Sequence, residues 1–314
     1  MNDIATSPVP ARVNVVDVGP RDGFQAEQTF IPTELKIRVI DALSAAGVRK
    51  IETTAFVHPK AVPQMADARE VLRGIERTAG VSYTVLVPNT RGAELALEQD
   101  IDGIRLVVCA SETFNQRNVR MSIEESIRDC EAIVKLASGG DVPVEVAIGV
   151  AFGCPFEGPT PEDRVAELAR SFAEMGIREL SIADTVGMAN PVQVARLMTR
   201  LQDELGGVEL SLHIHNTRGL GFANVLAGLQ AGIDTYDASV GGLGGCPVTP
   251  AATGNIPTED LVNMCDEMNI ETGVDVERVI KASRLVEAFL QRPLPSHVLL
   301  AGTNRHAVER HRRL

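Results

Sequence analysis

The sequence predicts an α/β protein, a (β/α)8 (TIM) barrel followed by a C-terminal helical extension. Short apolar segments alternate with longer helix-like segments along most of the 314 residues. Eight such repeats over roughly 250 residues are typical of a closed barrel of parallel strands. Polar and ionisable residues follow several of these apolar segments, at the end of the barrel where active sites lie.

The predicted strands are apolar and rich in β-branched residues. They cover residues 13–19, 50–56, 82–88, 102–110, 142–152, 179–184, 209–215 and 235–242. The helix predicted over residues 32–47 opens with a proline and closes with a glycine, which is a common pattern. A doubly wound open sheet would show the same alternation. No G-x-G-x-x-G follows the first strand, which disfavours a dinucleotide-binding version of that fold.

The repeat divides the chain into three regions. Residues 1–12 are expected to form a disordered leader, residues 13–270 the barrel, and residues 271–314 the helical extension with its basic tail. The N-terminus lacks a basic segment followed by an apolar core, so it is not a secretory signal. The five cysteines lie far apart, which favours free thiols in a reducing compartment. We therefore expect a cytoplasmic protein.

Charge and hydropathy limit the partners. The net charge of −12 disfavours nucleic-acid binding, which depends on clustered Lys and Arg. No apolar run reaches the roughly 18–20 residues of a membrane helix. A small anionic substrate remains compatible, because a few local cations or a metal ion can reverse the field inside a cleft.

Two histidines at strand spacing point to a metal centre. His213 and His215 end the seventh predicted strand in the run HIH, and residues two apart on a strand face the same side. Together with a carboxylate such as Asp22 after the first strand, they would form a divalent-metal site open to water and substrate. Histidines hydrogen-bonded within the core are the alternative.

Other polar residues follow the same strand ends. Arg21 offers donors suited to an enolate oxygen, and its alternative is an ion pair with Asp22 within a turn. Glu52 is either a structural partner of Arg21 or a catalytic group. Cys246, in the glycine-rich run GGLGGCP, could transfer a proton or be an inert loop thiol. The remaining candidates at these ends are Gln25, Asp184, Thr185 and Asn255.

These segments together resemble the hydroxymethylglutaryl-CoA lyase family of metal-dependent barrel lyases. The matching runs are DVGPRDGFQAE, IETTAFVHPKAVPQMAD, GCPFEG, ADTVGMANP, HIHNTRG, GGLGGCP and ATGNIPTEDLV, from about residue 13 to 275. The resemblance implies cleavage of a 3-hydroxyacyl-CoA to acetyl-CoA and a ketone such as acetoacetate. It also implies an acyl-CoA partner, and we expect a homo-oligomer.

The resemblance also implies roles for single residues. Asp22, His213, His215 and Asn255 would hold Mg2+ or Mn2+, and Arg21 would steady the enolate oxygen and bind substrate. The catalytic set would be Arg21, Glu52, Asp184 and Cys246. Gln25 and Thr185 would join Arg21 in binding substrate.

Four positions depart from the family pattern. Glu145 and Ala147 stand where the family carries an Arg and a Tyr near the acyl pocket, and Asn216 and Leu220 follow the histidine pair in place of Asp and Gln. These departures keep open a lyase for another 3-hydroxyacyl-CoA, such as citramalyl-CoA. A condensing enzyme resembling isopropylmalate synthase is disfavoured by the GGLGGCP loop. A non-catalytic barrel is disfavoured by the full set of polar residues.

Overall fold

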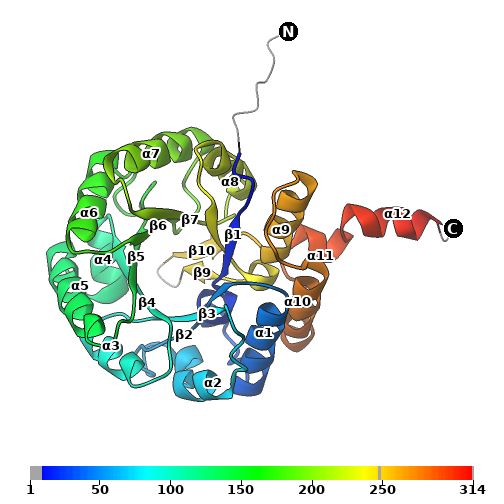
Figure 1. Cartoon of the computed structure of the whole chain (residues 1–314), viewed down its shortest axis with the longest axis horizontal. Coiled ribbons are helices and arrows are strands. Elements are labelled where there is room, and N and C mark those ends of the chain that lie inside the picture. The colour runs from blue at the N-terminus through cyan, green and yellow to red at the C-terminus, as the bar shows by residue number, and fades with distance from the viewer. Residues whose placement is uncertain (1–8, 247–248, 313–314) are drawn as a thin grey trace, which may run out of the picture.

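Eight parallel strands form a closed barrel ringed by helices (Figure 1). The structure, a computed structural model, describes residues 9–246 and 249–312, with side chains for residues 9–245 and 254–308. The strands are β1 (Asn14–Asp17), β2 (Lys50–Ala55), β3 (Ser82–Leu86), β4 (Gly103–Cys109), β5 (Val144–Gly149), β6 (Glu179–Asp184), β7 (Glu209–Ile214) and β8 (Thr235–Ala238). β8 pairs with β1, from Asn14 opposite Thr235 to Asp17 opposite Ala238, and closes the barrel. The predicted fold class is confirmed.

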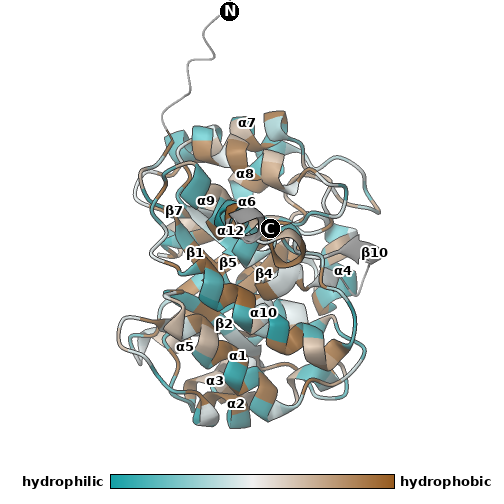
Figure 2. Ribbon diagram, turned by 90° about the vertical axis from the view of Figure 1, so that its right-hand side faces the viewer, coloured by the Kyte–Doolittle hydropathy of each residue, from teal (hydrophilic) through white to brown (hydrophobic). Residues whose placement is uncertain are grey.

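Helices fill the connections between consecutive strands. Those of the ring are α1 (Thr33–Ala45), α2 (Ala68–Gly74), α3 (Thr90–Leu97), α4 (Glu112–Val119), α5 (Ile123–Ser138), α6 (Glu162–Glu174), α7 (Pro191–Glu204) and α8 (Gly221–Gln230). Side-chain caps fix several helix starts: Ser122 and Glu125 form a capping box on α5, and Asn190 and Gln193 form one on α7. The helices turn apolar residues toward the strands and polar residues outward (Figure 2).

Irregular segments follow the strands that carry the site. β1 runs into a tight helical turn, η1 (Gly19–Gly23), and β8 into a short 3-10 turn, η3 (Val240–Gly242). An antiparallel hairpin of β9 (Gly245–Cys246) and β10 (Thr249–Thr253) comes next and is drawn over the middle of the barrel in Figure 1. The sequence placed residues 239–242 in the last strand, but the chain has already turned there, with Gly241 at φ 66°.

Further helices follow the repeat. They are α9 (Thr258–Glu267), α10 (Val276–Leu290), α11 (His297–Ala301) and α12 (Asn304–Arg312). α10 packs against α1, and α12 projects from the body (Figure 1). Arg12 bridges to Glu271, so residues at the end of the expected leader contact the start of the C-terminal region. Among the described residues, no helix combines the length and apolarity of a membrane span.

Candidate metal centre and active site

Asp22, His213 and His215 meet at the C-terminal mouth of the barrel. One ligand atom from each of the three lies within 4.8 Å of the others. β7 carries His213, and His215 directly follows this strand, so that their Nε2 atoms lie 3.1 Å apart; η1 supplies Asp22. Burial, with His213 close by, lowers the pKa of His215 to about 3, so its imidazole is neutral. Two imidazoles and a carboxylate form a donor set suited to a divalent ion.

Asn255 completes this cluster through backbone pairing. His215 and Asn255 form an isolated antiparallel bridge, which holds the asparagine beside β7. Its amide Nδ2 donates to Asp22 Oδ2 at 2.7 Å and to the Leu243 carbonyl at 3.1 Å. Its Oδ1 is buried without a hydrogen-bond partner among the described residues. A buried acceptor left unpaired is costly, and coordination of a cation would satisfy it.

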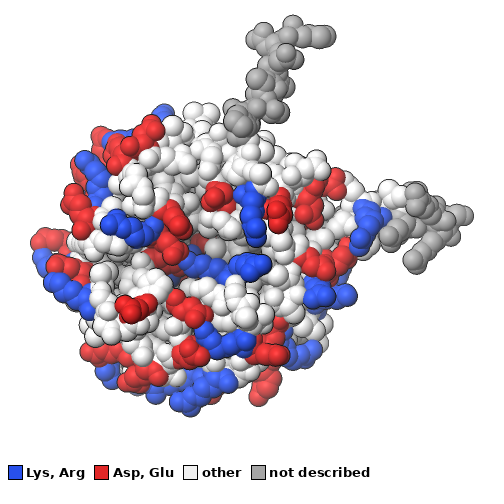
Figure 3. All heavy atoms as spheres, viewed as in Figure 1, with Lys and Arg blue, Asp and Glu red and all other residues white. Residues whose placement is uncertain are grey.

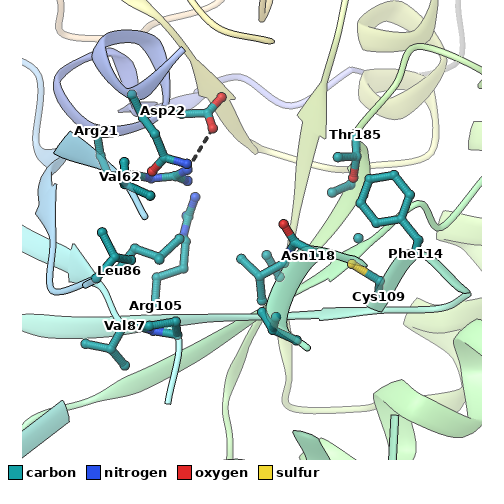
Figure 4. Close-up of a pocket in the computed structure, with 18 of the residues that line it drawn as sticks. Arg21, Asp22, Val62, Leu86, Val87, Arg105, Cys109, Phe114, Asn118 and Thr185 are labelled. Carbon is teal, nitrogen blue, oxygen red and sulfur yellow. Dashed lines mark hydrogen bonds and ion pairs between the residues drawn. The ribbon is translucent and has the colours of Figure 1, made fainter. Parts of the chain in front are cut away.

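Arg21 lies beside the same cluster, held by two carboxylates. Its Nε donates to Glu52 Oε1 in a short contact, and its Nη1 donates to Asp22 Oδ1 at 2.7 Å (Figure 4). Burial opposes the charge of Arg21, but Glu52 and Asp22 raise its pKa above the ordinary value. The pKa of Asp22 is lowered against the effect of burial, mainly by Arg21 and then by the two histidines. Both groups are therefore charged, and Glu52 acts on the cavity through Arg21.

A layer of buried charged side chains lies beneath the two histidines, and the sequence pattern did not predict it. Arg105, only 2% exposed on β4, donates to both oxygens of Asp237 on β8 at 2.6 and 3.1 Å. The Nε of Arg105 also donates to Glu145 Oε1 at 2.6 Å, and its Nη1 lies 3.1 Å from Glu52 Oε2. Asp237 Oδ2 in turn lies 3.1 Å from His213 Nδ1. The only signals in the sequence are a lone Arg and a lone Asp inside apolar strands.

The contact with Asp237 fixes the tautomer of His213. A carboxylate only accepts hydrogen bonds, so Nδ1 of His213 must carry a proton, and Nε2 is the nitrogen left to bind a metal ion. Burial would raise the pKa of Asp237, but Arg105, followed by His213, lowers it well below the ordinary range. Asp237 therefore stays ionised and orients an imidazole toward the cluster.

The other predicted residues occupy different positions. Gln25 and Thr185 line the cavity described below. Asp184 does not line it: its Oδ1 accepts from the backbone amides of Met188 and Ala189 at 2.7 and 3.1 Å, and burial raises its pKa to about 6. The side chain of Cys246 lies outside the described residues, although its neighbour Gly245 borders the cavity.

A cavity of about 530 Å³ opens over these residues. One side carries the polar groups Arg21, Asp22, His213 and His215. Apolar side chains also line it: Figure 4 shows Leu86 and Val87 near the Arg105 side chain, and Cys109 and Phe114 across the cavity beside Thr185 and Asn118. Basic and polar residues occur among the rest of the lining, namely His58, Asn89, Arg117, Asn118 and Arg120.

The two residues on β5 that depart from the family pattern, Glu145 and Ala147, lie in different surroundings. Ala147 lines the cavity, but Glu145 does not and lies at the level of the buried charge layer. Glu145 also accepts a hydrogen bond from Lys50 Nζ at 2.6 Å, and the same Nζ lies 2.5 Å from Glu179 Oε2. The expectation that Glu145 belongs to the acyl pocket is therefore corrected: this side chain holds Arg105, which lines the cavity in its place.

Comparisons with known proteins agree with this architecture. The HMGL-like family matches residues 12–286. The chain is 42% identical over 292 residues to a hydroxymethylglutaryl-CoA lyase of Bacillus subtilis, covering 93% of this chain and 98% of the relative. It is 41% identical over 293 residues to the human mitochondrial hydroxymethylglutaryl-CoA lyase, covering 93% and 90%. The structure of an HMG-CoA lyase from Acinetobacter baumannii in complex with coenzyme A and 3-methylmalate superposes with a TM-score of 0.91, at 43% identity, covering 94% of this chain and 96% of that one.

Proposed function

The chain belongs to the HMGL-like family, and from this premise we propose that it is a metal-dependent lyase that cleaves hydroxymethylglutaryl-CoA to acetyl-CoA and acetoacetate. The observation that carries the proposal is the meeting of Asp22, His213 and His215 with Arg21 around one cavity. The reaction breaks the C2–C3 bond. The C3 hydroxyl gives up its proton and becomes the ketone of acetoacetate. The electron pair of the broken bond passes to the thioester as an enolate, and protonation at C2 yields acetyl-CoA.

The donor set fits a hard divalent cation. Asp22, His213, His215 and the unpaired Oδ1 of Asn255 would hold Mg2+ or Mn2+. Such an ion, when bound, supplies a Lewis acid that makes the substrate hydroxyl more acidic. Asp237 keeps the lone pair of His213 Nε2 turned toward the cluster, and Arg105 keeps Asp237 ionised.

Charge stabilisation falls to Arg21. Its guanidinium lines the cavity and is immobilised by Glu52 and Asp22, so it meets a developing enolate oxygen without reorganisation. Glu52, with no exposed surface, is a positioning residue for Arg21 and Arg105. Cys246 is proposed to return a proton to C2, because it follows Gly245 at the cavity wall. Asp184 holds the turn after β6 that carries Thr185, which lines the cavity.

The test is release of acetyl-CoA from hydroxymethylglutaryl-CoA by purified, chelator-stripped protein, measured before and after addition of Mg2+ or Mn2+. We expect metal-dependent release at ordinary enzymic rates, with acetoacetate formed in equal amount. Folded, metal-loaded protein that releases neither product would overturn the proposal. Condensation of acetyl-CoA with a 2-oxo acid by the same protein would favour a synthase instead.

We further propose that the enzyme is a cytoplasmic homo-oligomer. Sedimentation of the full chain and fractionation of the source cell test this proposal. A single sedimenting species with the 33.6 kDa mass of one chain would contradict the oligomer.

A further inference from the structure

The apolar side of the cavity points to the substituent that the substrate carries on C3. We propose that this lyase prefers a 3-hydroxy-3-alkylglutaryl-CoA whose alkyl group is longer than methyl, with Ala147 as the residue that admits it. The inference rests on the proposed function and specifies its substrate. The side chains of Arg21, Asp22, His213 and His215 would face the hydroxyl and the carboxylate, and the β3–β5 wall would face the alkyl group.

Small side chains leave that wall hollow. Val107 on β4 and Ala147 on β5 are direct neighbours in the parallel pairing, and both face the cavity. Inward-facing residues of a barrel normally fill its interior in layers of bulky branched side chains. Here Val107 is only half-buried although it lies within β4, and Leu86 and Ala147 also line the cavity. A longer alkyl group would cover more of this apolar surface than a methyl group does.

Electrostatics favour an apolar substituent over a charged or polar one. Arg105 is the cation at the base of this wall, and its guanidinium is already engaged by Glu52, Glu145 and Asp237. It therefore offers no unmet positive charge to a second anionic group. The side chains that β3, β4 and β5 contribute to this wall, Leu86, Val107 and Ala147, supply no hydrogen-bonding groups. Burying a hydroxyl against them would leave that hydroxyl without a partner, at a cost of about 1–3 kcal/mol.

The magnitude follows from apolar transfer. Each buried methylene contributes about 0.8 kcal/mol, equivalent to roughly fourfold in the specificity constant. Replacing the C3 methyl by propyl adds two methylenes, so we expect kcat/KM to rise about 15-fold. Because the added contact is present before and during bond cleavage, the rise should come mainly from a lower KM.

The experiment compares three substrates on the metal-loaded enzyme, by initial rates of acetyl-CoA release. They carry methyl, propyl or 2-hydroxyethyl on C3, the last matching propyl in length but ending in a hydroxyl. We expect propyl to exceed methyl about 15-fold and 2-hydroxyethyl to lose that gain. In the variant Ala147→Leu, the propyl-to-methyl ratio should fall toward one.

Each outcome decides a separate point. Cleavage of the methyl substrate with a poorer propyl substrate would overturn this inference and leave the proposed lyase intact. Equal gains with propyl and 2-hydroxyethyl would also overturn it, because the wall would then select length and not apolarity. Cleavage of none of the three would overturn the proposed function itself. If Ala147→Leu does not fold, Val107→Phe narrows the same wall from β4 and must lower the same ratio.

Discussion

Replacing Asp237 by Asn removes one negative charge from the layer beneath the proposed metal centre. The carboxylate accepts two hydrogen bonds from Arg105 and lies 3.1 Å from Nδ1 of His213, with no exposed surface. Breaking a buried ion pair by removing one partner typically costs about 3–5 kcal/mol of unfolding free energy. Loss of the carboxylate that orients a ligating histidine typically weakens metal binding about 10–100-fold. We expect both losses in Asp237→Asn.

Glu145→Gln is the matched control. Like Asp237→Asn, this substitution removes one carboxylate that pairs with the Arg105 guanidinium. Glu145 contacts Arg105 and Lys50 but has no hydrogen bond to His213. We expect a similar loss of stability with Mn2+ affinity kept within about twofold. Titration calorimetry with Mn2+ and denaturant unfolding of the metal-free proteins measure the two quantities. Wild-type affinity in Asp237→Asn, or equal weakening in both variants, would refute the assigned role of Asp237.

Three further perturbations test neighbouring features. His215→Ala should lower Mn2+ affinity and turnover together, and elemental analysis showing unchanged metal content would remove His215 from the site. Burial raises the pKa of Glu259 to about 7, above its ordinary 4.5, so its contribution to stability is complete at low pH and lost as pH rises through 7. Between pH 4 and 8 wild type should therefore lose about 3 kcal/mol of unfolding free energy that Glu259→Gln keeps; parallel denaturation profiles would contradict this. In Gly244→Ala the new Cβ would lie 2.4 Å from Nδ2 of Asn255, so Mn2+ affinity should fall, whereas Gly158→Ala, also at positive φ but with open space, should leave it unchanged.

Periodicity was sufficient to predict the barrel, because a parallel strand buried on both sides reads as a short apolar run. The same pattern predicted that Asp22, His213 and His215 would lie close together, and the structure brings them together although Asp22 in η1 lies nearly 200 positions earlier in the chain. Strand ends that meet at one rim make such proximity predictable without coordinates.

The charged layer was not predictable in the same way. Arg105 and Asp237 are single charged residues within apolar strands, and they meet because closure of the barrel places β4 and β8 across its interior from each other. A pattern along one strand cannot show which side chain across the barrel will meet it. Glu145 was misplaced for a related reason: alignment located it on β5 but could not show that it lies at the depth of Arg105. The β9–β10 hairpin was also missed, since its segment consists mainly of glycine, proline and small residues.

The continuous set of ion pairs from Lys50 through Glu145 and Arg105 to Asp237 has a consequence for how this sequence can evolve. A mutation at any one of these positions removes one partner from a buried charge and leaves that charge less fully compensated, which costs a sizeable fraction of a typical protein's total stability. Their mutational effects must therefore be strongly non-additive. We therefore expect homologous sequences to change these positions on β2, β4, β5 and β8 in compensating pairs. Positions on the outer helices should change independently of one another.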